Sequence, residues 1–330
     1  MDTQFVLGLI GGGILVALGA VLTHFLTGRR ESKRLEFEKA QESDRVRLEQ
    51  YRIALEYHDT PVSLRDFDMS GQNLRGIGLS HADLQGANLK GADLRAANLE
   101  YADLRDAKVD QTTQIDDKWR LVWEIVNSGA PGRDLRQADL SMANLRGATL
   151  KKADLEAGNL RNALLEGADL ETANLGSAHL GGAKLQGANL ERSTAQGATM
   201  RDANLQGATL RGSRLEGVDL ERADLYMADL EGTVLCRADL ANAGMAGINL
   251  QDCNLKGANL QGARLPNANL RGAMLAGANL QKADLEGANL EGADLSGAHL
   301  RDASLDDKSV LPDGWGKLVA STPRELHVIQ

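Results

Sequence analysis

The sequence predicts an all-β solenoid, and three regularities along the chain predict it. Leucine recurs every five residues from Leu135 to Leu305, where it occupies 32 of 35 positions. A small residue, usually Ala, stands two residues before nearly all of these positions, and Gly often stands two residues after them. Neither 3.6 nor 2 divides evenly into five, so a long helix or a long flat strand is disfavoured. A short extended piece followed by a turn fits the period.

Each place in the five-residue unit predicts a role. In an extended piece, residues two apart point to the same face, so Ala and Leu would both face inward. The residue between them is usually Asp or Asn, which would face outward and bond nearby backbone groups at a turn. Gly suits the corner, where unusual backbone angles are needed. No single unit can bury its leucine alone, so neighbouring units must stack.

Units such as ANLQG at 258–262 and ADLEG at 283–287 resemble the pentapeptide-repeat family. A shorter tract from Leu64 to Val109 keeps the same step and raises the number of units to 45. The resemblance implies a right-handed quadrilateral β-helix with four pentapeptides in each coil. A core of stacked Leu and Ala also explains why aromatic residues make up only 3% of the chain.

Residues 1–28 are predicted to form a transmembrane anchor. The 22 residues 5–26 contain no Lys, Arg, Asp or Glu, and as a helix they would span about 33 Å, enough for a bilayer core of about 30 Å. A cleaved signal peptide would begin with basic residues and carry a shorter apolar stretch. The basic cluster at 29–34 follows the span, so the repeats are expected in the cytoplasm, beside a plasma or thylakoid membrane.

Two glycines in this span have a spacing that lets membrane helices approach closely. Gly8 and Gly12 form a G-x-x-x-G pair, which predicts a packing face between transmembrane helices. Ordinary glycine enrichment in membrane helices explains the same spacing equally well.

The charged residues 29–60 are expected to form a helical stalk. They contain no Gly, and Leu48, Tyr51 and Leu55 share one face of the helix. We expect the last turns of the stalk to pack on the first coil. The alternative is a dimeric coiled coil, which would make the protein a homodimer.

A helical insert is predicted at 110–133, between a first repeat tract at 61–109 and the main β-helix at 134–305. The two tracts are out of phase, because Val109 and Leu135 lie 26 residues apart. One face of the insert carries Trp119, Val122, Trp123 and Val126. The segment resembles a helical insert that recurs in pentapeptide proteins of cyanobacteria. We expect its two Trp side chains to cover a break in the leucine core; the alternative is a knob that binds a partner.

The five-residue period stops after Leu305. Residues 306–330 are predicted to be a cap and tail in which Trp315 covers the last core layer, since the end of a solenoid needs protection from edge pairing.

Cys253 replaces Ala at an inward place in its unit and should be buried, whereas Cys236 should face solvent. The two thiols would lie on opposite sides of the wall, so a disulfide between them is not expected.

The sequence offers little sign of catalysis. His179 and His299 share a face but lie six coils apart, about 29 Å, which is too far to share a metal. The chain shows none of the common metal, nucleophile or phosphate-binding motifs. We therefore expect no enzyme activity, cofactor, metal or small-molecule substrate. A net charge of −9 also argues against general affinity for nucleic acid.

These observations predict a membrane-tethered, non-enzymatic scaffold or adaptor. Its partner would be a protein, with the assembly or regulation of a membrane complex as the expected process. The candidate contact residues are Tyr226, Met227 and Cys236, together with Trp119 and Trp123 if the insert is a knob.

The family resemblance also implies an alternative function, because some members protect DNA gyrase by mimicking a duplex. That function needs a sustained anionic face. Here one face reads Lys151, Glu171, Glu191 and Arg211, in which the signs mix.

Overall fold

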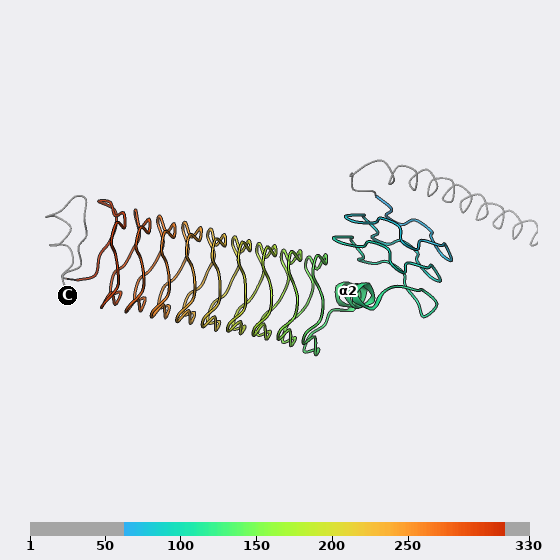
Figure 1. The fold of residues 1–330 in the computed structure, drawn as a ribbon, viewed down its shortest axis with the longest axis horizontal. Helices are drawn as coiled ribbons and strands as arrows, with labels where there is room; N and C mark the ends of the chain where they lie inside the picture. Colours follow the sequence, from blue (N-terminus) through green and yellow to red (C-terminus); the bar gives the residue numbers. More distant parts are fainter. Residues whose placement is uncertain (1–62, 314–330) are drawn as a thin grey trace, which may run out of the picture.

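The computed structural model describes residues 63–313. They form two stacks of four-sided coils, with one α-helix, α2 (Asp117–Ser128), between the stacks (Figure 1). The predicted anchor at 5–26, the stalk at 29–60 and the tail beyond 313 lie outside the described residues. No helix within the described range is long and apolar enough to cross a membrane.

The coils are held in a register of four pentapeptides. Single-residue parallel bridges join each unit to the fourth unit after it, as between Thr209 and Asp229. Around this bridge the Leu210 N–H donates to the Asp229 carbonyl at 2.7 Å, and the Asp229 N–H donates to the Ala208 carbonyl at 2.9 Å. Four units therefore make one coil, and the predicted coil length is confirmed.

The leucine column fills the interior of both stacks. Leu210 is 1% exposed and Ala208 is fully buried, and the same holds along nearly the whole second stack. The three residues that replace leucine, Ala195, Met200 and Met245, are fully buried as well. The prediction that Ala and Leu both face inward is therefore confirmed.

The corners of the coils use left-handed backbone conformations. Gly212 has a φ of 62° there, but Lys152 and Met227 occupy the same place with φ of 60° and 55°. A non-glycine residue in this conformation costs about 1–2 kcal/mol. The stacking offsets part of that cost, because the corner N–H donates to the next coil, as from Met227 to the Ala246 carbonyl at 3.0 Å.

The outward Asp and Asn residues also bond between coils. Asp229 Oδ1 accepts from the Glu231 N–H at 3.2 Å, which is the local turn contact expected from the sequence. The same oxygen accepts from Asn249 Nδ2 of the next coil at 2.9 Å. Asn159 over Asp139, Asn174 over Asp154, and Asn259 over Asp239 repeat the arrangement. Placing neutral Asn above Asp avoids stacking two like charges.

Both stacks end in the same turn. The last coil of each is lengthened by a single residue, shown by the bridges from Asp93 to Gln114 and from Asn289 to Val310. Thr113 Oγ1 donates to the Leu89 carbonyl at 2.9 Å in the first stack, and Ser309 Oγ donates to the Leu285 carbonyl at 3.0 Å in the second.

An aspartate holds each of these turns together. Asp110 Oδ1 accepts from the Thr113 N–H at 3.1 Å, and Asp306 Oδ1 accepts from the Ser309 N–H at 3.0 Å.

Helix α2 lies against the end of the first stack. Its buried face consists of Trp119, Val122 and Ile125, while Trp123 and Val126 are partly buried. Trp123 Nε1 donates to the Ala107 carbonyl at 2.6 Å. The helix ends at Gly129, whose N–H bonds the Ile125 carbonyl.

The other side of α2 contacts the second stack. Lys118 Nζ lies 3.1 Å from Asp139 Oδ2 and 2.9 Å from Ser141 Oγ. One backbone bond joins the stacks directly, from the Tyr101 N–H to the Met142 carbonyl at 2.7 Å. The coils of the two stacks run in different directions (Figure 1), so α2 stands at a bend between them.

Replacing a core leucine by a charged residue should unfold several coils. We expect Leu210→Asp to lower the free energy of unfolding by at least about 3 kcal/mol, because it removes packed methyl groups and buries a carboxylate without a partner. Thermal unfolding followed by circular dichroism measures the loss. The matched control is Gln261→Asp on the outer surface, and equal melting of the two variants would contradict the inward leucine column.

A second prediction concerns the corners. Gly187 has a φ of 63°, and no atom lies within 4 Å of the place that a Cβ atom would take, so backbone strain is the main cost of adding a Cβ there. We expect Gly187→Val to lower the unfolding free energy by about 1–2 kcal/mol. Gly187→Asn should cost much less, because Asn visits this conformation readily. Equal losses for the two variants in the same melting assay would contradict this account.

Candidate interaction surface

One side of the second stack stands out for its exposed apolar residues. This side is made by the units that recur every 20 residues from Leu145 to Leu285. We call the outward residues of its last six units, which are centred on Leu185, Leu205, Leu225, Met245, Leu265 and Leu285, the Tyr226 face.

Tyr226 and Met227 form a ridge on this face. They are 53% and 57% exposed, against 45% for Val310, the other exposed large hydrophobic residue of the described range. The Tyr226 N–H donates to Asp224 Oδ1 at 3.1 Å, so the backbone beneath the ridge is fixed. Met227 lies over Gly247, since a methyl group there would come within 2.5 Å of Met227 Sδ.

The unit beside the ridge lacks long outward side chains. Gly244 and Ala246 occupy its outward places on the Tyr226 face, and Gly247 forms its corner. The coil after it carries Arg264 and Pro266. The face therefore presents a ridge next to a bare strip at Gly244 and Ala246, and Met227 covers the Gly247 corner at one edge of this strip. The strip separates Tyr226 from the following unit.

The charges of the Tyr226 face do not pair with one another. Lys184, Asp224, Arg264, Asp284 and Glu286 lie on it, and none of them forms an ion pair within residues 63–313. Asp224 accepts a neutral hydrogen bond from Gln206 Nε2 at 2.6 Å. These cations and acids stay available to groups outside the chain.

The neighbouring side, which begins with the Leu140 unit, behaves differently. Arg222 bonds both carboxylate oxygens of Asp202 at 2.9 Å and reaches Glu221 at 2.5 Å. Arg201 contacts Asp219 and Glu221. Cations interleaved with acids interrupt the negative charge that mimicry of a nucleic-acid duplex requires.

The two cysteines occupy the side of the stack opposite the Tyr226 face. Cys253 is fully buried and its thiol donates to the Leu230 carbonyl at 2.8 Å. Burial raises the pKa of the Cys253 thiol to about 12. Cys236 is partly exposed, and both thiols are free. The predicted inward place of Cys253 is confirmed.

The two Trp residues of α2 face the core. Trp119 is 7% exposed, and Trp123 is partly buried and hydrogen-bonded to the first stack. Neither projects as an isolated knob. Gly8 and Gly12, the predicted packing pair of the anchor, lie outside the described residues.

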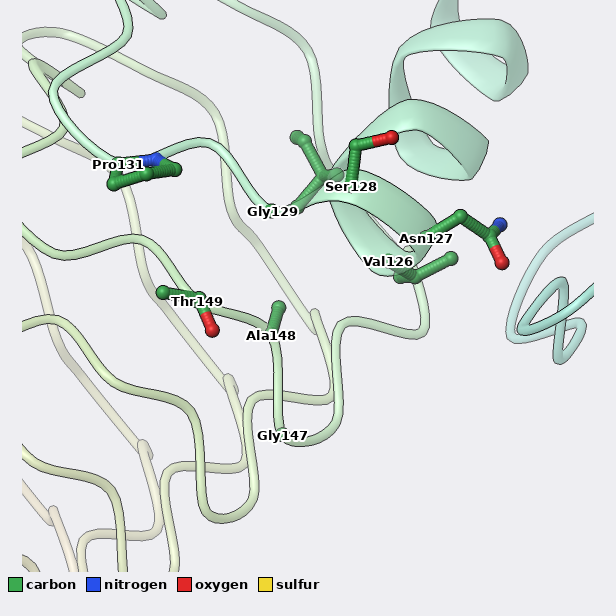
Figure 2. A pocket seen from close by; sticks show the side chains of 9 residues that line it. Val126, Asn127, Ser128, Gly129, Pro131, Gly147, Ala148 and Thr149 are labelled. Carbon is green, nitrogen blue, oxygen red and sulfur yellow. The ribbon is translucent and has the colours of Figure 1, made fainter.

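A cleft of about 310 Å³ lies where α2 meets the second stack. Figure 2 shows the last turn of α2, with Val126 and Asn127, on one side, and Ala148 and Thr149 of the first coil on the other. None of the nine lining residues is ionisable, so the cleft holds no general acid or base. Within 63–313, no group of three His, Cys, Asp or Glu residues could hold a metal ion.

Comparison with known proteins places the chain in a family. Eight copies of the model for pentapeptide repeats match residues 73–111 and, in overlapping stretches, residues 134–307. These matches cover more than half of the chain, so the protein belongs to the pentapeptide-repeat family. The fold of this family is the right-handed quadrilateral β-helix.

Several solved structures are similar. HetL, involved in heterocyst differentiation regulation in the cyanobacterium Nostoc, is 28% identical, over 78% of this chain and 92% of its own, with a TM-score of 0.31. Rfr23 from the cyanobacterium Cyanothece is 39% identical, over 30% of this chain and 63% of its own, with a TM-score of 0.22. Full-length QnrB1, a plasmid-mediated fluoroquinolone resistance protein, is 16% identical, over 73% and 94%, with a TM-score of 0.23. No curated protein matches the chain.

The sequence alone predicts Tyr226, Met227 and Cys236 as separate exposed residues. It does not reveal the bare strip at Gly244 and Ala246 or the unpaired charges around it. Once the four-pentapeptide register is known, both features can be read by aligning each unit with the unit one coil away.

The two thiols should differ sharply in reactivity. We expect Cys236 to react with Ellman's reagent in the native protein and Cys253 to react only after unfolding, because burial and the raised pKa keep its thiol protonated. The Cys236→Ser variant isolates the buried thiol. Rapid labelling of native Cys236→Ser would contradict the inward position of Cys253.

Proposed function

We propose that this protein is a membrane-tethered, non-enzymatic scaffold that binds a protein partner through the Tyr226 face. The observation that carries the proposal is the exposure of Tyr226 and Met227, each more than half exposed, on a backbone held by the inter-coil ladder. Tyr and Met are enriched in protein interfaces, where a few large side chains supply most of the binding energy.

The stiffness of the rod supports this function. Each coil is bonded to the next on all four sides, so the outward residues are held in place before a partner arrives. Such preorganisation reduces the entropy lost when two proteins associate. A flat, rigid surface with one apolar ridge suits the docking of another folded protein.

The tether is proposed from the sequence. The uncharged residues 5–26 would anchor the chain in a plasma or thylakoid membrane, and the basic cluster at 29–34 would keep the repeats in the cytoplasm. Anchoring raises the effective concentration of the rod near other membrane proteins. We therefore place the partner in a membrane complex, with a role in the assembly or regulation of that complex.

Affinity purification from solubilised membranes, followed by mass spectrometry, tests this function. We expect the wild-type protein to retain a defined set of membrane proteins. The double variant Tyr226→Glu, Met227→Glu should lose them at least tenfold, because it places charge on the apolar ridge.

The matched control is Lys256→Glu on the opposite side of the stack, which should retain the full set. Identical sets from all three proteins, or no specific protein from any of them, would contradict the proposed function.

A further inference from the structure

We propose that the Tyr226 face binds a second copy of this chain, forming an antiparallel dimer about a two-fold axis. This inference rests on the proposed function in one respect, that the Tyr226 face is a protein-binding surface. It names a second copy as an occupant of that surface, in reversible exchange with the membrane partner, and leaves the other three sides of each rod uncovered.

The face is self-complementary in shape. Consider a two-fold axis that lies between the two rods, perpendicular to them, and passes midway between the coils of Leu225 and Met245. This operation reverses the order of the coils. Each residue then faces the residue that occupies the same place in a unit of the second copy. Tyr226 then lies over Ala246 of the second copy, and Asp224 lies over Gly244. Symmetry repeats each contact, so Tyr226 of each copy fills the strip at Gly244 and Ala246 of the other copy.

The charges are complementary in the same register. Lys184 and Asp284 occupy the same place in units that lie equally far from the axis on either side. Lys184 therefore faces Asp284 of the second copy, and symmetry makes two such pairs. Both side chains lack an ion-pair partner within residues 63–313. Arg264 would face the neutral side chain of Asn204.

Neighbouring registers lose these contacts. Moving the axis onto the Leu225 coil places Tyr226 against itself and Lys184 against Arg264, two like charges. Both the shape match and the charge match are lost in that arrangement.

Moving the axis the other way, onto the Met245 coil, pairs Asp224 with Arg264. It also lays Tyr226 over Pro266 instead of the bare strip, and Lys184 no longer faces an acid. Of these three arrangements, only the one with the axis midway between the Leu225 and Met245 coils places Tyr226 over the bare strip. It is also the only one that places Lys184 opposite Asp284.

The contact between the two copies is small. From the Leu185 coil to the Leu285 coil there are five coil steps, or about 24 Å along the rod at ~4.8 Å each. A strip of this length and one side in width falls below the ~800 Å² per partner of a standard interface. We therefore expect a reversible dimer whose population depends on protein concentration.

Sedimentation velocity on the full-length, detergent-solubilised protein tests the pairing. Wild type should show a concentration-dependent dimer. Lys184→Asp and Asp284→Lys should each raise the dimer Kd at least tenfold, because each places like charges opposite one another. The double variant Lys184→Asp, Asp284→Lys restores opposite charges and should return the Kd to within about threefold of wild type.

Two further variants separate this face from the rest of the molecule. Tyr226→Glu should raise the Kd at least tenfold with unchanged thermal melting, because the side chain is exposed. Lys256→Asp, a cation-to-acid change on the opposite side, should leave the Kd unchanged.

Three results would overturn the dimer: a wild-type protein that is monomeric at every concentration, a dimer that Tyr226→Glu leaves intact, and a double swap that fails to recover. A monomer that still retains membrane proteins would contradict the dimer and support the proposed function. A dimer with the expected variant pattern that retains no other protein would support the dimer and contradict the proposed function.

Discussion

The backbone ladder between coils is the constraint on which the rest of the molecule depends. Each inward leucine donates its N–H to the following coil, as from Leu210 to the Asp229 carbonyl, and that coil donates back, as from the Asp229 N–H to the Ala208 carbonyl. The ladder and the leucine column share a period of four pentapeptides, so a slip by one residue would turn every leucine out of the core. Where one residue is inserted, before Gln114 and before Val310, the regular stack ends.

The same register organises the surface. Residues one coil apart lie one above the other, so outward side chains meet neighbours that are distant in sequence. Asn249 bonds Asp229 in this way, and Arg222 bonds Asp202. On most of the rod, polar and charged side chains form hydrogen bonds or ion pairs with the side chains stacked above or below them.

The Tyr226 face departs from this arrangement. Its glycine-rich coil at 244–247 interrupts the stacked contacts, which leaves Asp224 and Arg264 two coils apart without a shared contact. Charged groups that are held in place but form no ion pair distinguish this surface from the sides where cations and acids are paired.

Much of this architecture could be predicted from the sequence because it is periodic. One unit specifies the inward places, the outward place and the corner, and repetition extends these roles along the chain. Cys253 could be placed inside by its position alone, and it is buried. The corners are predicted less completely. Non-glycine residues such as Lys152 and Met227 adopt the left-handed conformation there, because the ladder holds their backbone whatever their own preference.

The bend between the stacks could not be predicted, because nothing periodic relates its two sides. The helical pattern predicts a face of Trp119, Val122, Trp123 and Val126. Helix α2 is instead packed between two surfaces, and Ile125 is more deeply buried than Val126. Single contacts fix its position, including Trp123 to Ala107 on one side and Lys118 to Asp139 on the other. A pattern along one helix gives the direction of its core face only when there is one core. Here the first stack ends against α2 and the second begins beside it, so the helix packs against both. Its orientation therefore follows from tertiary contacts.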